Sequence, residues 1–418
     1  MRIITDFHIH SKYSRAVSKE MDLNNLNKWA QIKGIDVLGT GDFTHPQWLK
    51  ELKENLEPAE EGLFKLKNIN KNFTRFILTT EVSCIYSKKG RVRKIHILIF
   101  VPDFRTAERI NKRLDLIGNL SADGRPILGL DAKELVKIVL NISPQAVIIP
   151  AHLWTPWFGI LGSKSGFDSF EECFEEWNEY IFAAETGLSS NPAMNWRLSK
   201  LDDITLISNS DAHSPQKIGR EANVFNIEIS YSSIINAIRF KNKEKFLYTI
   251  EFFPEEGKYH YDGHRGCGVS CSSEETRKYG GVCPVCGKSL TIGVMSRVEE
   301  LADRKKGFLP SYAIPFKSLV PLKEIIADAL DLGTQSKKVE GEYFNLVNHF
   351  ENEFRVLLDV GFDDLKKITS SRIAEAIIKV REGKVYLKPG YDGVFGRITV
   401  FPEKIKFVSS KSRQNSLF

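Results

Sequence analysis

Histidines and carboxylates recur through residues 1–230, each at or just after a short apolar stretch. The first two form the pair His8-x-His10, and another pair, Asp211-x-His213, comes much later in the chain. Alternate residues of an extended segment share a face, so both members of such a pair can reach one point. Imidazole nitrogen together with carboxylate oxygen suits Zn, Mn or Fe better than Mg alone. The sequence therefore predicts two or three divalent metals (Zn, Mn, Mg or Fe), with the ligands His8, His10, Asp42, His45, Glu81, His96, His152, Asp211 and His213.

Each of these residues also has an ordinary structural role open to it. A single His at a strand end is usually hydrogen-bonded or solvated, and Asp42 and Glu185 could equally cap helices. Asp42 and His45 lie so close in sequence that either could supply the ligand from that loop. The set as a whole is different, because no structural rule places His or a carboxylate after nearly every strand. Asp211, His152 and Glu185 are the candidates for catalytic residues.

The segments that must position these residues alternate between short apolar runs and amphipathic stretches. The runs, bounded by turn residues, include RIITDFHIH, IDVLGTGD, KIHILIFVP, QAVIIPAH and ITLISNSDAH. Runs of this kind fit buried parallel strands, and stretches such as LNNLNKWAQIKG fit crossover helices. We therefore expect an α/β fold over residues 1–250: a distorted seven-stranded βα barrel, with the carboxyl ends of its strands around one mouth. An open, doubly wound sheet is the alternative.

Length and composition set broad limits. A chain of 418 residues favours two or three domains. No run of about 18 apolar residues occurs, and the N-terminus lacks the layout of a signal peptide, so we expect a soluble, cytoplasmic protein. The net charge of +6 and the pI near 8.8 are compatible with a polyanionic partner without being diagnostic of one.

Four of the six cysteines form the pattern C-x3-C-x11-C-x2-C within residues 251–293, which we expect to be a separate zinc module. Two close pairs of thiolates can surround one Zn tetrahedrally, which leaves no open position for catalysis. His264 lies nearby but is not needed once both pairs are complete. The predicted structural zinc ligands are Cys267, Cys271, Cys283 and Cys286.

The segments around and after the cysteines favour nucleic-acid contact, although each also has a plainer interpretation. Lys and Arg alternate with Tyr around the module, which fits either phosphate and base contact or a solvated face. Residues 294–405 are expected to form a helical, DNA-binding region, although its helical hairpin fits plain packing as well. Residues 406–418 are expected to be a flexible tail with part of a sliding-clamp-binding motif, in Gln414, Leu417 and Phe418.

The strand-end residues resemble those of the polymerase and histidinol phosphatase superfamily. The matching motifs are His8-Ile-His10, Gly41-Asp42 with His45, Glu81, His96, His152, and Asp211-Ala-His213. The resemblance implies a distorted seven-stranded barrel that holds up to three metal ions. This chain departs from the superfamily pattern at two positions. Ala16 stands where many members have another His or Asp, and Phe43 stands where many have a His after the Asp.

The order of barrel, cysteine module, helical region and tail resembles the archaeal endonuclease Q family. The segments GTGDFTHPQW, AETGLSSNP and KPGYDGVFG carry this likeness, together with the cysteine spacing. The resemblance implies an enzyme that nicks duplex DNA on the 5′ side of hypoxanthine, uracil, xanthine and abasic sites.

A DNA enzyme of this kind has to displace the damaged nucleotide from the stack. In HLWTPWFG, the aromatic residues follow a ligand strand directly and fit a wedge or pocket wall, or equally a loop packed over the mouth. The candidates for the base pocket are Trp154, Trp157, Phe158, Ser189, Ser190 and Asn191.

Two other functions are compatible with the same motifs. A small-molecule metallophosphatase of the histidinol phosphatase type would need the metals, but neither the cysteine module nor the helical region. A non-catalytic repair scaffold would be a barrel that has lost activity, for which Ala16 and Phe43 leave some room.

Overall fold

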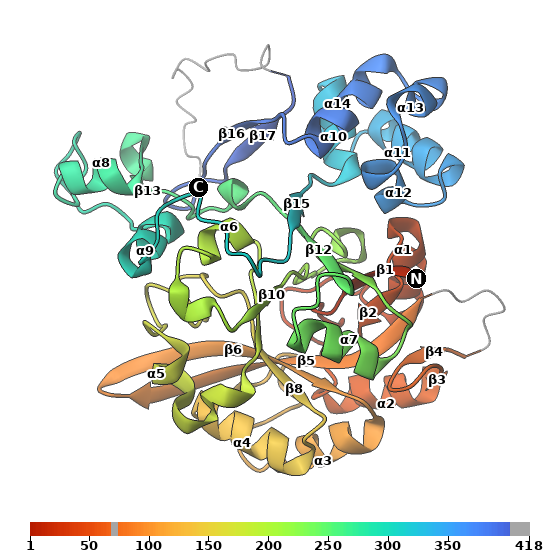
Figure 1. Ribbon diagram of the computed structural model, residues 1–418, viewed down its shortest axis with the longest axis vertical. Coiled ribbons are helices and arrows are strands. Elements are labelled where there is room, and N and C mark those ends of the chain that lie inside the picture. Colours follow the sequence, from red (N-terminus) through yellow and green to blue (C-terminus); the bar gives the residue numbers. More distant parts are fainter. Residues whose placement is uncertain (68–73, 402–418) are drawn as a thin grey trace, which may run out of the picture.

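The computed structural model describes residues 1–67 and 74–401 (Figure 1). In this part of the chain, no helix is long and apolar enough to cross a membrane. The barrel strands are β1 (Arg2–Asp6), β2 (Val37–Gly39), β5 (Arg75–Lys88), β6 (Arg91–Val101), β8 (Val147–Pro150), β9 (Ala183–Glu185), β10 (Thr205–Ile207), β11 (Ala222–Asn226) and β12 (Phe246–Glu251). Three further strands are β3 (Leu56–Pro58), β4 (Phe64–Leu66) and β7 (Ile127–Leu128).

The barrel encloses an apolar core to which one side of each strand contributes. Alternate residues of a strand point to opposite faces, so Ile3 faces this inner core while Ile4 belongs to the outer one. Helix α7 (Tyr231–Arg239) closes one end of the barrel, where its Ile234 and Ile238 join the inner core. Both faces of the strands are buried, which explains the apolar runs in the sequence. The inner core contains Ile3, Phe7, Val37, Ile77, Leu98, Phe100, Val147, Ile149, Ala183, Ile207 and Phe225.

The mixed α/β fold confirms the predicted fold class, but the strands are not all parallel and do not form one continuous sheet, because β9 and β10 form a separate two-stranded sheet. β1 pairs with β2, and β2 with β5, in parallel, whereas β6 runs antiparallel to both β5 and β8. The reason is local: Lys89 and Gly90, both with positive φ, form a two-residue turn between β5 and β6. Such a turn joins antiparallel neighbours, because a parallel connection needs a dozen or more residues. β11 also pairs antiparallel with β1.

Helices cover the outside of the barrel. Helix α1 starts at Asp22, whose carboxylate accepts a hydrogen bond from the Asn25 backbone N–H, and α3 and α4 start at capping aspartates in the same way. Helix α2 begins directly after His45. The helices of this part are α1 (Leu23–Lys33), α2 (Pro46–Asn55), α3 (Phe104–Leu114), α4 (Ala132–Ile142), α5 (Phe170–Phe174), α6 (Pro192–Asn195) and α7.

The chain then leaves the barrel and returns to it. The cysteine segment contains β13 (Asp262–His264), β14 (Val269–Cys271) and α8 (Ser273–Lys278), and it is followed by α9 (Val294–Leu301). Strand β15 (Phe316–Ser318) pairs in parallel with β12 and so extends the barrel sheet. The helices α10 (Leu322–Leu330), α11 (Lys337–His349), α12 (Glu353–Leu358), α13 (Phe362–Ile368) and α14 (Ser371–Arg381) gather above it in Figure 1, followed by the hairpin β16 (Tyr386–Lys388) and β17 (Arg397–Thr399).

Candidate metal centre

Glu81 lies at the centre of two overlapping groups of metal-ligating side chains. One group contains His8, His10, Glu81 and Asp211, and the other contains Glu81, His96 and His152. Within each group, the ligand atoms lie within 4.8 Å of one another. The predicted multi-ligand cluster therefore forms, and it divides around one shared carboxylate.

The two oxygens of Glu81 face different groups. Oε2 lies 3.5 Å from His8 Nε2 and 3.3 Å from His10 Nε2. Oε1 lies 2.8 Å from His96 Nδ1 and 3.0 Å from His152 Nε2. A carboxylate with one oxygen toward each group is the geometry of a ligand that bridges two cations.

The donor atoms of the first group lack partners in the protein, which is what a cation site requires. His8 Nε2, His10 Nε2 and Asp211 Oδ1 are buried and have no hydrogen-bond partner. His8 Nε2 lies 3.6 Å from Asp211 Oδ1, and His10 Nε2 lies 3.1 Å from it. Buried polar atoms are nearly always satisfied, so three converging lone-pair donors fit a divalent cation.

The carboxylates around the two first histidines also fix the state of their rings. Burial by itself would lower the pKa of His8, but facing carboxylates, Glu185 foremost, raise it well above its ordinary value. The pKa of His10 is likewise raised, chiefly by Asp42, against the opposing effect of burial. A cation bound between the rings would take the place of these protons, because metal-ligating imidazoles are neutral.

Asp42 and Glu185 lie behind the ligands instead of among them. Asp42 accepts hydrogen bonds from His10 Nδ1 at 3.0 Å and from the Ser11 backbone N–H at 2.6 Å. Glu185 lies 3.0 Å from His8 Nδ1 and accepts a hydrogen bond from the His152 backbone N–H at 2.9 Å. Both carboxylates are fully buried, and neither belongs to a ligand group. Each instead holds a ring with its Nε2 atom facing the centre.

Of the remaining predicted ligands, His45 and His213 lie outside both groups. The His45 ring stacks on Tyr13 with centroids 4.4 Å apart, at the start of α2. His213 Nδ1 lies 2.8 Å from the backbone oxygen of Asp211, and its ring centroid is 4.8 Å from that of His10. Phe43, where a His was expected by resemblance, is fully buried in the outer core.

The backbone is strained where it presents the site. Asp42, His152 and Asp211 have φ values of 49°, 29° and 46°, in the left-handed region that non-glycine residues rarely adopt. Each follows a barrel strand by a few residues: β2, β8 and β10 respectively. Such conformations cost on the order of 1–3 kcal/mol each and persist only where the surrounding structure enforces them. The strained residues are thus two members of the ligand groups, His152 and Asp211, and Asp42, which holds the His10 ring.

Arg125 is a site residue that the sequence did not reveal. Its Nη1 donates to Glu81 Oε2 at 3.1 Å, and its side chain is 28% exposed. Asp123 orients the loop by accepting hydrogen bonds from the backbone N–H groups of Arg15 and Arg125. An arginine is not a metal ligand, so a search for ligand spacing passes over it. A partly exposed guanidinium beside the cluster is suited to bind an anion.

The aromatic residues predicted for the base pocket differ in how far they are exposed. Trp157 is 52% exposed with Lys94 Nζ 4.8 Å from its ring centroid, and the half-buried Phe158 packs on the His96 ring at 4.2 Å. Trp154 is buried and donates its Nε1–H to Asn195 Oδ1. It therefore belongs to the core and not to a surface that DNA could touch.

The three polar candidates of the base pocket lie in the loop before α6. Ser190 is fully buried and donates to the backbone oxygen of Thr186. Asn191 is the N-cap of α6 and accepts a hydrogen bond from the Met194 N–H. Ser189 is half-buried. Ser190 and Asn191 thus hold the loop in shape.

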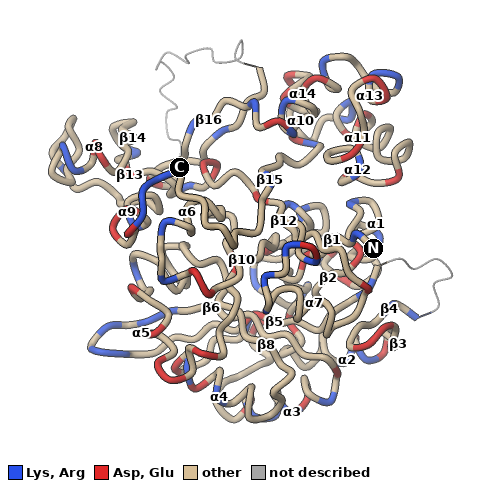
Figure 2. Tube along the Cα trace, in the orientation of Figure 1, with Lys and Arg blue, Asp and Glu red and all other residues tan. Residues whose placement is uncertain are grey.

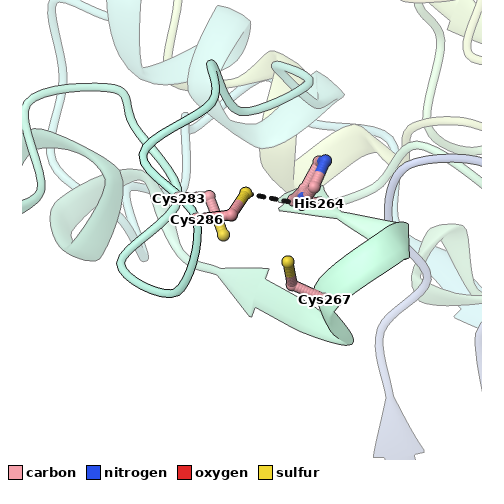
Figure 3. A group of neighbouring side chains, drawn as sticks. All are labelled: His264, Cys267, Cys283 and Cys286. Carbon is pink, nitrogen blue, oxygen red and sulfur yellow. Dashed lines mark hydrogen bonds between the residues drawn. The ribbon is translucent and has the colours of Figure 1, made fainter.

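The cysteine module gathers three of the four predicted thiols and one imidazole (Figure 3). The group is His264, Cys267, Cys283 and Cys286, with Cys286 Sγ 3.5 Å from His264 Nδ1. Cys271 lies outside this group but packs in a small apolar cluster with Cys283 and Leu290. His264-x2-Cys267 and Cys283-x2-Cys286 have equal spacing, a signal in the sequence that makes His264 a candidate ligand beside the four cysteines. Four ligands leave no open position, which is typical of a structural metal site.

Residues 321–384 match the family model described as the MJ0043 C-terminal domain. Over 264 residues the chain is 34% identical to the protein MJ0043 of Methanocaldococcus jannaschii, a match that covers 61% of this chain and 32% of that protein. The chain therefore spans about a third of the length of that relative.

Two crystal structures match nearly the entire chain. One is the lesion-specific endonuclease PfuEndoQ from Pyrococcus furiosus, 31% identical, with a TM-score of 0.86 over 97% of each chain. The other is endonuclease Q in complex with a 27-mer duplex substrate that has an abasic lesion at the active site. It is 31% identical, with a TM-score of 0.83 over 97% of this chain and 98% of that chain.

The shared carboxylate predicts unequal effects of two substitutions on metal content. Glu81→Ala should lose both barrel metals, because both groups depend on Glu81, whereas His96→Ala should lose only one. Elemental analysis of purified protein measures metal per chain, and thermal unfolding checks that each variant folds. His45→Ala is the control and should keep the full content. Equal metal loss in the Glu81 and His96 variants would contradict a bridging role.

The cysteine module gives a second prediction. Cys267→Ser should release the metal of the module, whereas Cys271→Ser should retain it, because Cys271 lies outside the ligand group. Metal content of the two variants, measured in parallel, distinguishes the cases. If Cys271→Ser lost the metal while His264→Ala kept it, the four-cysteine set expected from the sequence would be right after all.

Proposed function

The chain belongs to the endonuclease Q family, and on that premise we propose that it is a metal-dependent endonuclease that cuts duplex DNA beside damaged nucleotides. The single observation that carries the chemistry is the shared Glu81, with one oxygen toward each ligand group. We further propose that cleavage occurs 5′ to the lesion, and that the lesions include hypoxanthine, uracil, xanthine and abasic sites.

The metals of the barrel are proposed to be two, held by His8, His10, Glu81 and Asp211 on one side and by Glu81, His96 and His152 on the other. When bound, such a pair lowers the pKa of a water molecule and stabilises the charge that develops on the phosphate. The mixed nitrogen and oxygen donors indicate a class of ions, Zn, Mn, Mg or Fe, and do not select one member of it. Zn is proposed for the cysteine module, because thiolate and imidazole favour it.

The protein residues have separate tasks in this proposal. Asp42 and Glu185 fix the orientation of His10 and His8 through their Nδ1 atoms. Asp211 has a side chain that is 26% exposed, so it is the ligand most open to the substrate. Arg125, beside Glu81, is placed to pair with a phosphate oxygen of the DNA.

Basic segments on one side of the molecule suit the DNA backbone. Figure 2 shows Lys and Arg at the tip of the β5–β6 hairpin and on the stretch after α9. Lys89 and Arg91 at that tip are exposed, as are Lys305 and Lys306 after α9. Phosphate contacts of this kind supply affinity without sequence preference.

A sliding clamp remains a proposed partner on sequence grounds alone. Gln414, Leu417 and Phe418 lie outside the residues that the structure describes. A small-molecule phosphatase is the alternative function. It gives no role to the module and helical region, which are included in the matches that cover 97% of the chain.

A nicking experiment tests the proposal. We expect a labelled duplex with one uracil, hypoxanthine or abasic site to be cut on the 5′ side of the lesion when Mn, Mg or Zn is supplied. The matching undamaged duplex should stay intact, and Glu81→Ala should be inactive. Absence of lesion-dependent cutting by metal-loaded protein, together with turnover of p-nitrophenyl phosphate, would favour the small-molecule phosphatase instead.

Trp157 is proposed to stack on a base beside the displaced nucleotide. Base–aromatic stacking contributes about 1–3 kcal/mol, so Trp157→Ala should weaken binding to lesion-containing duplex by about 5- to 150-fold. Binding measured with catalytically inactive protein checks this, and the metal content should not change. Phe240→Ala is the control, since Phe240 is 71% exposed but follows α7 at the closed end of the barrel. Equal effects of the two substitutions would remove Trp157 from the DNA contact.

A further inference from the structure

A groove of about 820 Å³ lies between α3 and α4, on the outside of the barrel. In Figure 1 the two helices lie side by side at the end of the molecule away from α10–α14. The residues that line the groove do not include any of the metal-ligating groups. The groove is therefore not part of the metal centre.

The groove combines apolar side chains with a cationic rim along α3, and α4 contributes charged residues of both signs. Leu116 is 75% exposed, and Ile138 is half-buried. The lining side chains recur at helical spacing, as Arg109, Lys112 and Arg113 from α3, and as Glu134, Lys137, Ile138 and Asn141 from α4. Residues three and four apart share one helix face, so each helix turns one face to the groove. Leu116, Ile117, Leu130, Ile138 and Ile142 supply the apolar surface.

The cations of the rims are largely unneutralised. Arg109, Lys112 and Arg113 are exposed, and none of them makes an ion pair with another residue among 1–67 and 74–401. Lys137 lies 3.8 Å from Glu134, but both side chains are about half exposed, so this pair contributes little. The three cations of α3 are in excess over the Glu134–Lys137 pair of α4, so the groove carries net positive charge and is complementary to a negatively charged, amphipathic partner.

We propose that this groove binds an acidic amphipathic helix of a partner protein. A third helix would place its apolar face on Leu116 and Ile138 and its carboxylates against Arg113, Lys112 and Lys137. Helix pairs bury such a face in this way throughout α-helical proteins. Nucleic acid suits the groove less well, since exposed aliphatic surface such as Leu116 offers it neither stacking nor a hydrogen bond.

The protein's own C-terminal segment is a poor occupant. Residues 402–418 contain Lys404, Lys406, Lys411 and Arg413 but only one acidic residue, Glu403. Their charge would be repelled by the rims. Because the groove lies apart from the ligand groups, a docked helix would leave the metal centre free, and the surface would serve to attach the enzyme to another protein while it works.

The test uses full-length protein and a fluorescent 16-residue helical peptide with Leu at one face and Glu at the other. We expect saturable binding by anisotropy, with at least a tenfold loss for Arg113→Glu and for Leu116→Ser. A peptide of the same composition in scrambled order is the control. Lys50→Glu, which changes an exposed cation of α2 outside the groove, controls for net charge, and lesion-dependent nicking should be unchanged in all variants.

Each other outcome would overturn the proposal. Equal binding of the scrambled peptide would show that only charge is sensed, and full binding by both groove variants would show that the peptide binds outside the groove. Loss of duplex affinity in Arg113→Glu would make the groove a DNA contact. Self-association of the wild-type protein that Leu116→Ser abolishes, measured by sedimentation velocity, would make a second copy the occupant. Nicking is measured separately, so failure here leaves the proposed nuclease function intact.

Discussion

The centre depends on one buried carboxylate shared between two groups of histidines. Glu81 is 1% exposed, and burial by itself would raise its pKa. His96, His8 and Arg125 oppose this and hold the pKa well below the ordinary value, so the carboxylate stays ionised. An ionised carboxylate inside a protein is costly unless it is paired, and here the Arg125 guanidinium pairs with Oε2 while imidazole rings face both oxygens. Because this carboxylate needs positive charge close to it, the pocket is also suited to bind divalent ions.

A network of hydrogen bonds holds the ligand side chains so that they face Glu81. His8 and His10 follow β1 directly, while the partners of their Nδ1 atoms, Glu185 and Asp42, come at the ends of β9 and β2. Asn209 donates to Glu185 at 2.9 Å and accepts from the Phe7 backbone N–H. Each ring is therefore held from a different strand. The barrel positions the site because its strands, distant in sequence, end around the same mouth.

Sequence reasoning found residues that converge but not their arrangement around the centre. His or carboxylate after successive strands could be recognised without a structure, and most of these residues do gather in two groups. That Asp42 lies behind His10, outside both groups, depends on a hydrogen bond of 3.0 Å, which spacing does not encode. Arg125 was missed because it comes from a loop that approaches Glu81 only in the folded chain. The antiparallel turn of β5 into β6 could have been read from the short SKKG segment, which is too short for a crossover.

The cysteine module and the barrel mouth are coupled through one buried arginine. Arg297 of α9, 8% exposed, donates to the backbone oxygens of Leu161 and Phe167 at 3.2 and 3.1 Å. These oxygens belong to the loop that also presents Trp157 and Phe158. From the other side, the His96 backbone N–H donates to the Phe158 oxygen at 2.9 Å, so the loop is fixed between a ligand strand and α9.

This arrangement gives the module a role beyond its own stability. Asp262 at the start of β13 accepts hydrogen bonds from the Gly293 N–H and the Ser296 hydroxyl, which set the first turn of α9. His264, two residues later on the same strand, belongs to the metal-ligating group of the module. A change in that group would therefore pass through β13 to α9, and through Arg297 to the aromatic loop beside the metal centre. The ligand group of the module is in this way linked by hydrogen bonds to the loop that carries Trp157 and Phe158.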